Sequence, residues 1–255
     1  MKLPAAPAAS TEFRNAAGSD VPKEFALAAR KNPDNITEMA ESLEEKKVLE
    51  KEALARSYVI VIDKSGSMVT KDGSGTRWDS ARKATEQLVE KVLEYDLDGS
   101  VPLYLFDHET EFVGDCVSPS QVLSVFEDSP PRRGTTNLAP CLDTVLGKYA
   151  GKNKENYENV PGLSVVVILD GETDNNQAVK DVMKKYADPV NGFCQSHTEI
   201  GIAFVRIGDD PGAMAFLKEL DMGVMGSPDI ASTCCDNELF APGGVEKCLY
   251  DAIFA

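Results

Sequence analysis

The chain has 255 residues, enough for one α/β domain with a sizeable core and a shorter appendage. Its 42 acidic residues outnumber its 26 basic residues, which gives a net charge of −16. A field of that sign repels phosphate backbones and argues against nucleic acid as a partner. No stretch approaches the ~20 consecutive apolar residues that a membrane span needs, so no membrane span is expected.

Residues 1–55 are expected to form an N-terminal extension, disordered in part and with one or two helices. The first 19 residues are rich in Ala, Pro and Ser, and prolines interrupt any apolar run that a secretory signal would need. The sequence therefore favours a cytoplasmic location, with organelle import left open. One helix is expected over residues 21–31. A second begins at Asn35, an N-cap followed three residues later by Glu38. This amphipathic arm either packs on the domain, contacts a partner or mediates self-association.

The first strand of the domain is expected at residues 58–63, where five apolar residues rich in β-branched side chains lead into Asp63. Ser65 and Ser67 follow at alternate positions. Because side chains in extended backbone repeat with period two, these three oxygen-bearing residues can face one pocket. Carboxylate and hydroxyl oxygens are the ligands that hard divalent cations prefer. The pattern therefore predicts a cation site at the end of this strand.

Beyond residue 57 the sequence alternates strand and helix patterns, as in a parallel sheet that is covered on both faces. A Gly/Ser/Asp loop is expected at residues 70–76. Strands are expected at residues 58–63, 101–106, 111–113, 163–170, 199–207 and 230–233. Helices are expected at residues 78–95, 120–127, 138–150, 176–186, 214–220 and 245–252. In sheets of this kind ligands bind at the carboxyl ends of the strands.

The sequence Asp63-x-Ser65-x-Ser67 resembles the metal-ion-dependent adhesion site of von Willebrand factor type A domains. Residues 134–138, Gly-Thr-Thr-Asn-Leu, resemble the family's threonine loop, with Thr136 as the ligand. Residues 163–172 resemble its fourth strand, which ends in the metal aspartate, here Asp170. The resemblance covers about residues 56–255. It implies a doubly wound, Rossmann-like and mostly parallel six-stranded sheet with helices on both faces.

The same resemblance implies a protein-binding module rather than an enzyme. Asp63, Ser65, Ser67, Thr136 and Asp170 would hold Mg²⁺, with Ca²⁺ or Mn²⁺ as alternatives. An Asp or Glu of a partner protein would then take an open position on the ion. Loops at residues 70–77, 107–109 and 171–176 would set specificity. The strongly acidic chain would oppose an acidic partner, and this conflict stays open at the level of sequence.

Two other functions stay open. The metal could serve only to hold the loops of a scaffold whose N-terminal arm makes the interactions. A Mg²⁺-dependent hydrolase is the weaker alternative, since a haloacid-dehalogenase-like phosphatase needs an acid at position 65, where this chain has serine. A serine hydrolase would need a Gly-x-Ser-x-Gly elbow, which is absent. His108 near the rim is expected to have no role, and His197 lies in no supporting motif.

The six cysteines are scattered and form no Cys-x-x-Cys pair. They are interpreted as buried or free thiols of a reducing compartment. Cys234 and Cys235 are neighbours, and neighbours in a strand point to opposite faces, so they are not expected to pair with each other. With two histidines in the chain, a zinc site of thiolate and imidazole ligands has little support.

Overall fold

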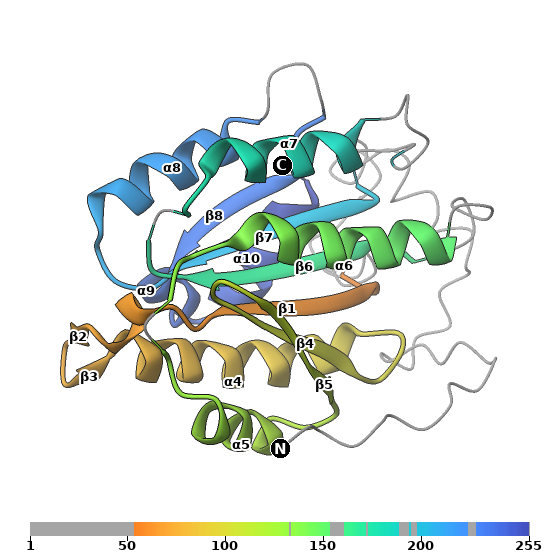
Figure 1. Cartoon of the computed structure of the whole chain (residues 1–255). Helices are drawn as coiled ribbons and strands as arrows, with labels where there is room; N and C mark the ends of the chain where they lie inside the picture. The colour runs from red at the N-terminus through yellow and green to blue at the C-terminus, as the bar shows by residue number, and fades with distance from the viewer. Residues whose placement is uncertain are drawn as a thin grey trace.

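The computed structural model describes residues 54–132, 134–153, 161–171, 173–188, 194, 198–223 and 228–254. Within these residues six strands form one sheet in the order β5-β4-β1-β6-β7-β8 (Figure 1). Neighbouring strands are parallel except for the antiparallel pair β4 and β5. The prediction of a mostly parallel six-stranded sheet is therefore confirmed. The strands are β1 (Ser57–Asp63), β4 (Val101–Phe106), β5 (Thr110–Cys116), β6 (Leu163–Leu169), β7 (Ile200–Arg206) and β8 (Ala231–Cys235).

Strand β1 lies in the middle of the sheet and is buried on both faces. Ile60 and Ile62 belong to the hydrophobic core on one face, and Val59 and Val61 belong to the core on the other. This division follows from the period of two along a strand, which sends successive side chains to opposite faces. A continuous apolar run is therefore what a central strand requires.

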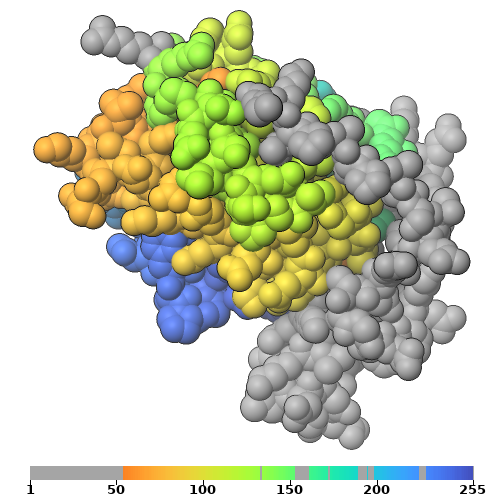
Figure 2. Space-filling model, turned by 90° about the horizontal axis from the view of Figure 1, so that it is seen from below, coloured from red at the N-terminus to blue at the C-terminus, as the bar shows by residue number. Residues whose placement is uncertain are grey.

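Helices cover both faces, as expected. Helices α4 (Arg77–Tyr95), α5 (Ser120–Asp128) and α10 (Gly244–Ile253) contribute to one core, and α6 (Leu138–Asn153), α7 (Asn176–Ala187) and α8 (Pro211–Asp221) to the other. Figure 1 shows α6, α7 and α8 on one side of the sheet and α4 on the opposite side. In Figure 2, which looks onto the α4 face, α5 lies along one side of α4 and the blue C-terminal segment along the other.

The loop expected at residues 70–76 contains regular structure instead. A one-turn 3-10 helix, η2 (Gly66–Val69), is followed by the antiparallel strands β2 (Lys71–Asp72) and β3 (Gly75–Thr76). Gly73 connects the two strands with φ +57°, a left-handed conformation that glycine adopts without strain. The short helix α9 (Asp236–Leu239), which follows β8, was also not predicted. The edge strand expected at residues 111–113 is longer, and a register shift lies opposite it between Leu103 and Tyr104.

The expected N-terminal extension, with its helices at residues 21–31 and from Asn35 onward, lies outside the described residues, and so does His197. Among the helices that the structure does describe, none has the length and apolar character needed to cross a membrane.

Candidate metal centre

The predicted site lies at the carboxyl ends of β1 and β6, which are parallel neighbours in register from Ser57 opposite Leu163 to Ile62 opposite Ile168. Asp63 is the last residue of β1, and Asp170 directly follows β6. Parallel pairing therefore brings two carboxylates that are far apart in sequence to the same edge of the sheet. Both side chains are fully buried.

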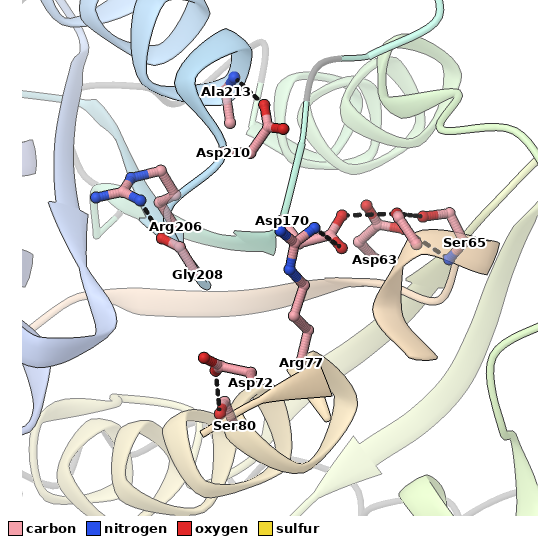
Figure 3. Close-up of polar contacts among 11 residues, drawn as sticks. Asp63, Ser65, Asp72, Arg77, Ser80, Asp170, Arg206, Gly208, Asp210 and Ala213 are labelled. Carbon is pink, nitrogen blue, oxygen red and sulfur yellow. Dashed lines mark hydrogen bonds and ion pairs between the residues drawn. The ribbon is translucent and has the colours of Figure 1, made fainter. Parts of the chain in front are cut away.

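Three hydrogen bonds join four of the five predicted site residues (Figure 3). The backbone N–H of Ser65 donates to Asp63 Oδ1 at 2.7 Å. The hydroxyl oxygens of Ser65 and Ser67 lie 2.9 Å apart, and the Ser67 hydroxyl donates to Asp170 Oδ1 at 2.8 Å. Asp63, Ser65, Ser67 and Asp170 therefore form one connected cluster of oxygen atoms.

The second carboxylate oxygen of Asp63, Oδ2, is buried and has no hydrogen-bond partner among the described residues. Burial, followed by the nearby charges of Asp170 and Asp107, raises the pKa of Asp63 to about 7, although hydrogen bonding from the backbone and side chain of Ser65 opposes this rise. A buried carboxylate oxygen without a partner is costly. A cation at this position would remove that cost.

The fifth predicted residue, Thr136, lies on the loop before α6. Among the described residues, its hydrogen bonds go to Asp174, on the loop between β6 and α7, and not to the four-residue cluster. Its N–H donates to Asp174 Oδ1 at 3.1 Å, and its carbonyl accepts the N–H of Asp174 at 2.9 Å. On the other side of Thr136, the N–H of Asn137 donates to the carbonyl of Asp107 at 2.9 Å. Protein hydrogen bonds therefore hold the threonine loop in place, and the Thr136 side chain is not needed to fix it.

Arg77 is a member of the site that sequence reasoning missed. Its Nη1 atom lies 2.9 Å from Asp170 Oδ2, and its side chain is 15% exposed. Figure 3 shows Arg77 extending from the start of α4 to the carboxylate. A capping box between Thr76 and Asp79 starts the helix and places Arg77 in its first turn. The Thr-x-x-Asp pattern could have located the helix start, but no sequence signal points from Arg77 to a residue 93 positions away.

A second arginine lies at the end of the neighbouring strand, β7. Arg206, the last residue of β7, donates from Nη1 to the carbonyl of Gly208 (Figure 3). Gly208 has φ +76°, and a Cβ added there would lie 3.0 Å from Nε of Arg77. Glycine at this position thus leaves room for the Arg77 side chain. Two arginines therefore lie at this edge of the sheet, and one of them, Arg77, is already paired with Asp170.

The set of donors fits a hard divalent cation. Asp63 and Asp170 supply charge, and the serine hydroxyls supply neutral oxygen atoms, as such ions prefer. Within the part of the chain that the structure describes, no group of three or more His, Cys, Asp or Glu side chains could hold a metal ion. The candidate therefore depends on hydroxyls beside two carboxylates, which suits Mg²⁺ better than a softer metal.

Residues 58–172 match the family model of the von Willebrand factor type A domain. No curated protein matches the sequence at a significant level. Among solved structures, the SpRpn10 VWA domain is 14% identical with a TM-score of 0.51, and the match covers 76% of this chain and 93% of that one. The manganese-loaded TRAP protein of Plasmodium vivax is 16% identical with a TM-score of 0.50, and the match covers 75% and 74%.

The protein BatB of Bacteroides thetaiotaomicron is 15% identical with a TM-score of 0.50, and the match covers 78% of this chain and 97% of that one. At these identities the likeness concerns the fold alone. Residues 58–172 are thus similar in sequence to von Willebrand factor type A domains, and the described residues share the fold of these solved structures.

Proposed function

We propose that the protein binds a partner protein through a divalent cation, Mg²⁺ or alternatively Ca²⁺ or Mn²⁺, held by Asp63, Ser65, Ser67, Thr136 and Asp170. The bound cation would supply a positive centre that can accept a carboxylate of an Asp or Glu side chain from the partner. The two aspartates supply the negative charge of the site, part of which Arg77 already balances, and the hydroxyls complete a set of oxygen ligands. The proposal assigns the protein a binding role without turnover.

The observation that carries this proposal is the buried and unpartnered Oδ2 atom of Asp63. The other carboxylate oxygens of the cluster are occupied, Asp63 Oδ1 by Ser65 and the two oxygens of Asp170 by Ser67 and Arg77. An acceptor left open in a cluster that is otherwise satisfied indicates a missing positive partner. The manganese of the Plasmodium vivax TRAP structure belongs to that protein, and it is consistent with a cation in this fold.

A binding role is favoured over a metal that only holds the loops together. The loops around the site already bond to one another without a metal, through Ser67 and Asp170, through Thr136 and Asp174, and through Asn137 and Asp107. A metal is therefore not needed to hold these loops together, and its main role would be to bind a ligand.

The first experiment measures Tm in EDTA and then with millimolar Mg²⁺, Ca²⁺ or Mn²⁺. A cation present at 100 times its Kd should add about 2.7 kcal/mol, which raises Tm by roughly 5 to 10 °C. Asp63→Asn should abolish the shift. The matched control is Asp98→Asn, because Asp98 accepts a hydrogen bond from Ser57 at the opposite end of the same strand. A shift of equal size in wild type and Asp63→Asn would contradict the site.

The second experiment tests the carboxylate. Bound Mn²⁺ enhances the relaxation of water protons, and a carboxylate that replaces bound water should lower this enhancement. A short peptide with one glutamate should lower it, whereas the same peptide with glutamine should not. Equal effects of the two peptides would contradict recognition of a carboxylate. Hydrolysis of p-nitrophenyl phosphate that is lost in Asp63→Asn would instead favour an enzyme.

A further inference from the structure

Two cysteines outside the candidate metal centre lie in direct contact. Cys234 in β8 and Cys248 in α10 are 14 positions apart in sequence, and their Sγ atoms are 2.7 Å apart. Both are free thiols in the structure. This separation is shorter than the van der Waals contact of two sulfur atoms and about 0.7 Å longer than an S–S bond, so little movement separates the two thiols from a covalent link.

The fold brings these sulfur atoms together through close packing of α10 against the sheet. Gly201 in β7 makes this approach possible, because a Cβ at that position would lie 2.5 Å from the carbonyl oxygen of Ala252 in α10. Cys248 is 3% exposed and belongs to the core on the α10 face, against which Cys234 also packs. The contact is thus fixed by packed elements, not by a loop.

We propose that Cys234 and Cys248 are a site of reversible disulfide formation, with a low-molecular-weight disulfide such as oxidised glutathione as the oxidant. The thiolate of Cys234, the more exposed of the two, attacks one sulfur of the oxidant, forms a mixed disulfide and releases one glutathione thiolate. The Cys248 thiolate then attacks Sγ of Cys234 and releases the second. The two cysteine protons go to the two released thiolates, so two thiols are oxidised while one disulfide is reduced.

The environment of Cys234 slows the formation of the disulfide but does not change which two cysteines it joins. The adjacent Cys248 thiol and then burial raise the pKa of Cys234 well above its usual range. Little thiolate is present at neutral pH, so the first step is slow. Once the mixed disulfide forms, the second thiol is already in contact, and closure is intramolecular.

The adjacent residue Cys235 provides a matched control. It follows Cys234 directly and its backbone N–H donates to Glu238 at 2.8 Å, where α9 begins. Because neighbours in a strand point to opposite faces, Cys235 faces away from the position that Cys234 takes against α10. If the geometry decides which cysteine pairs with Cys248, the disulfide forms with Cys234 and not with Cys235.

The experiment uses the full chain, reduced and then incubated with oxidised glutathione, with the remaining thiols blocked before tryptic digestion. Trypsin cleaves after Lys218 and Lys247, which separates the two cysteines onto different peptides. Mass spectrometry should find residues 219–247 linked to residues 248–255, in wild type and in Cys235→Ser but not in Cys234→Ser. Dithiothreitol should remove the link. The oxidised protein should melt roughly 5 to 10 °C above the reduced protein.

Three results would overturn the proposal. One is the absence of this linked pair in the oxidised wild type, which does not depend on whether any variant folds. Another is a link to residues 248–255 that persists in Cys234→Ser through Cys235. The third is glutathione attached to Cys234 without closure onto Cys248. None of these results depends on the cation, so this inference and the proposed function can fail separately.

Discussion

The Nη1 atom of Arg77 lies 2.9 Å from Oδ2 of Asp170, inside the cluster proposed to hold a divalent cation. The carboxylate is fully buried, and Ser67 donates to its other oxygen. A positive charge of the chain itself thus already balances one of the two aspartates. The cation and Arg77 would share Asp170, and their like charges repel.

Replacing Arg77 should therefore strengthen cation binding. In Arg77→Gln we expect the Kd for Mn²⁺, measured by isothermal titration calorimetry, to fall about tenfold, because a like charge next to the ion is removed. In EDTA the same variant should lose roughly 3 kcal/mol of stability, because a buried carboxylate loses its charged partner.

The control for this variant is Arg82→Gln on the same helix, where Arg82 pairs with Glu86 on a partly exposed surface. It should leave the Kd unchanged and alter stability by less than about 1 kcal/mol. A higher Kd for Mn²⁺ in Arg77→Gln would mean that the arginine supports the bound ion.

In metal-free protein, Asp63 should contribute a loss of stability as the pH rises from about 4 to 7. The pKa of Asp63 is about 7 in the fold against 3.8 for an ordinary aspartate, so the folded state binds more protons in this window. The contribution of Asp63 to the free energy of unfolding is fully present below pH 3.8 and is lost as the pH rises through about 7. Urea unfolding in EDTA at a series of pH values should show a slope of at most about 1.4 kcal/mol per pH unit from this group.

Asp96 adds a similar dependence of stability on pH, because burial and then the charge of Asp98 raise the pKa of Asp96 to about 7. Asp63→Asn should therefore reduce the pH dependence without removing it. A slope that is the same in wild type and Asp63→Asn would show that Asp63 is ionised in the folded protein throughout this range.

Thr136→Val should weaken cation binding without weakening the fold. The loop is held by backbone bonds to Asp174, which valine keeps. We expect the Kd for Mn²⁺ to rise about tenfold, as the loss of about one hydroxyl ligand or hydrogen bond implies, while Tm in EDTA stays within about 2 °C. The neighbour Thr135 is exposed, and Thr135→Val should change neither quantity. Equal Kd values for the two variants would remove Thr136 from the ligand set.

Gly201→Ala should destabilise the protein, because the added methyl group would meet the carbonyl oxygen of Ala252 at 2.5 Å. Overpacking of this kind costs typically 1–3 kcal/mol, or roughly 2 to 10 °C in Tm. Gly151→Ala in α6 is the control, because nothing lies within 4 Å of its added Cβ. Differential scanning calorimetry should find the control unchanged or more stable. An unchanged Tm in Gly201→Ala would indicate that α10 can move away from the sheet.

Much of the fold was predictable because its central strands are continuous apolar runs rich in β-branched residues, too short for helices. The apolar runs that begin at Tyr58 and Leu163 predict two buried strands. Because the carboxyl ends of parallel strands lie at the same edge of the sheet, Asp63 and Asp170 are then expected to lie close together. The hairpin at Lys71 was not predictable in the same way. Two strands of two residues each carry no measurable periodicity, and their pairing depends on the turn at Gly73.

The contacts that complete the site were less accessible to sequence reasoning. The sequence predicts Thr136 as a ligand beside the serines, but it does not predict that the backbone groups of Thr136 bond to Asp174. Arg77 reads in the sequence as an ordinary surface residue at the start of a helix, and only the fold directs it to Asp170. Long-range pairs of this kind depend on tertiary geometry, and a single sequence does not encode them as a pattern.

The central pairing of β1 with β6 also has a kinetic consequence. Ser67 and Asp170, which bond to each other, are 103 positions apart, and β1 lies beside β4 and β6 and not at an edge. Contacts that close such a long segment of chain form slowly during folding. The two aspartates can therefore meet only once β1 and β6 lie side by side. A folding intermediate that lacks the β1–β6 pair would have no cation site, so binding of the ion in a refolding experiment would report the formation of this pair.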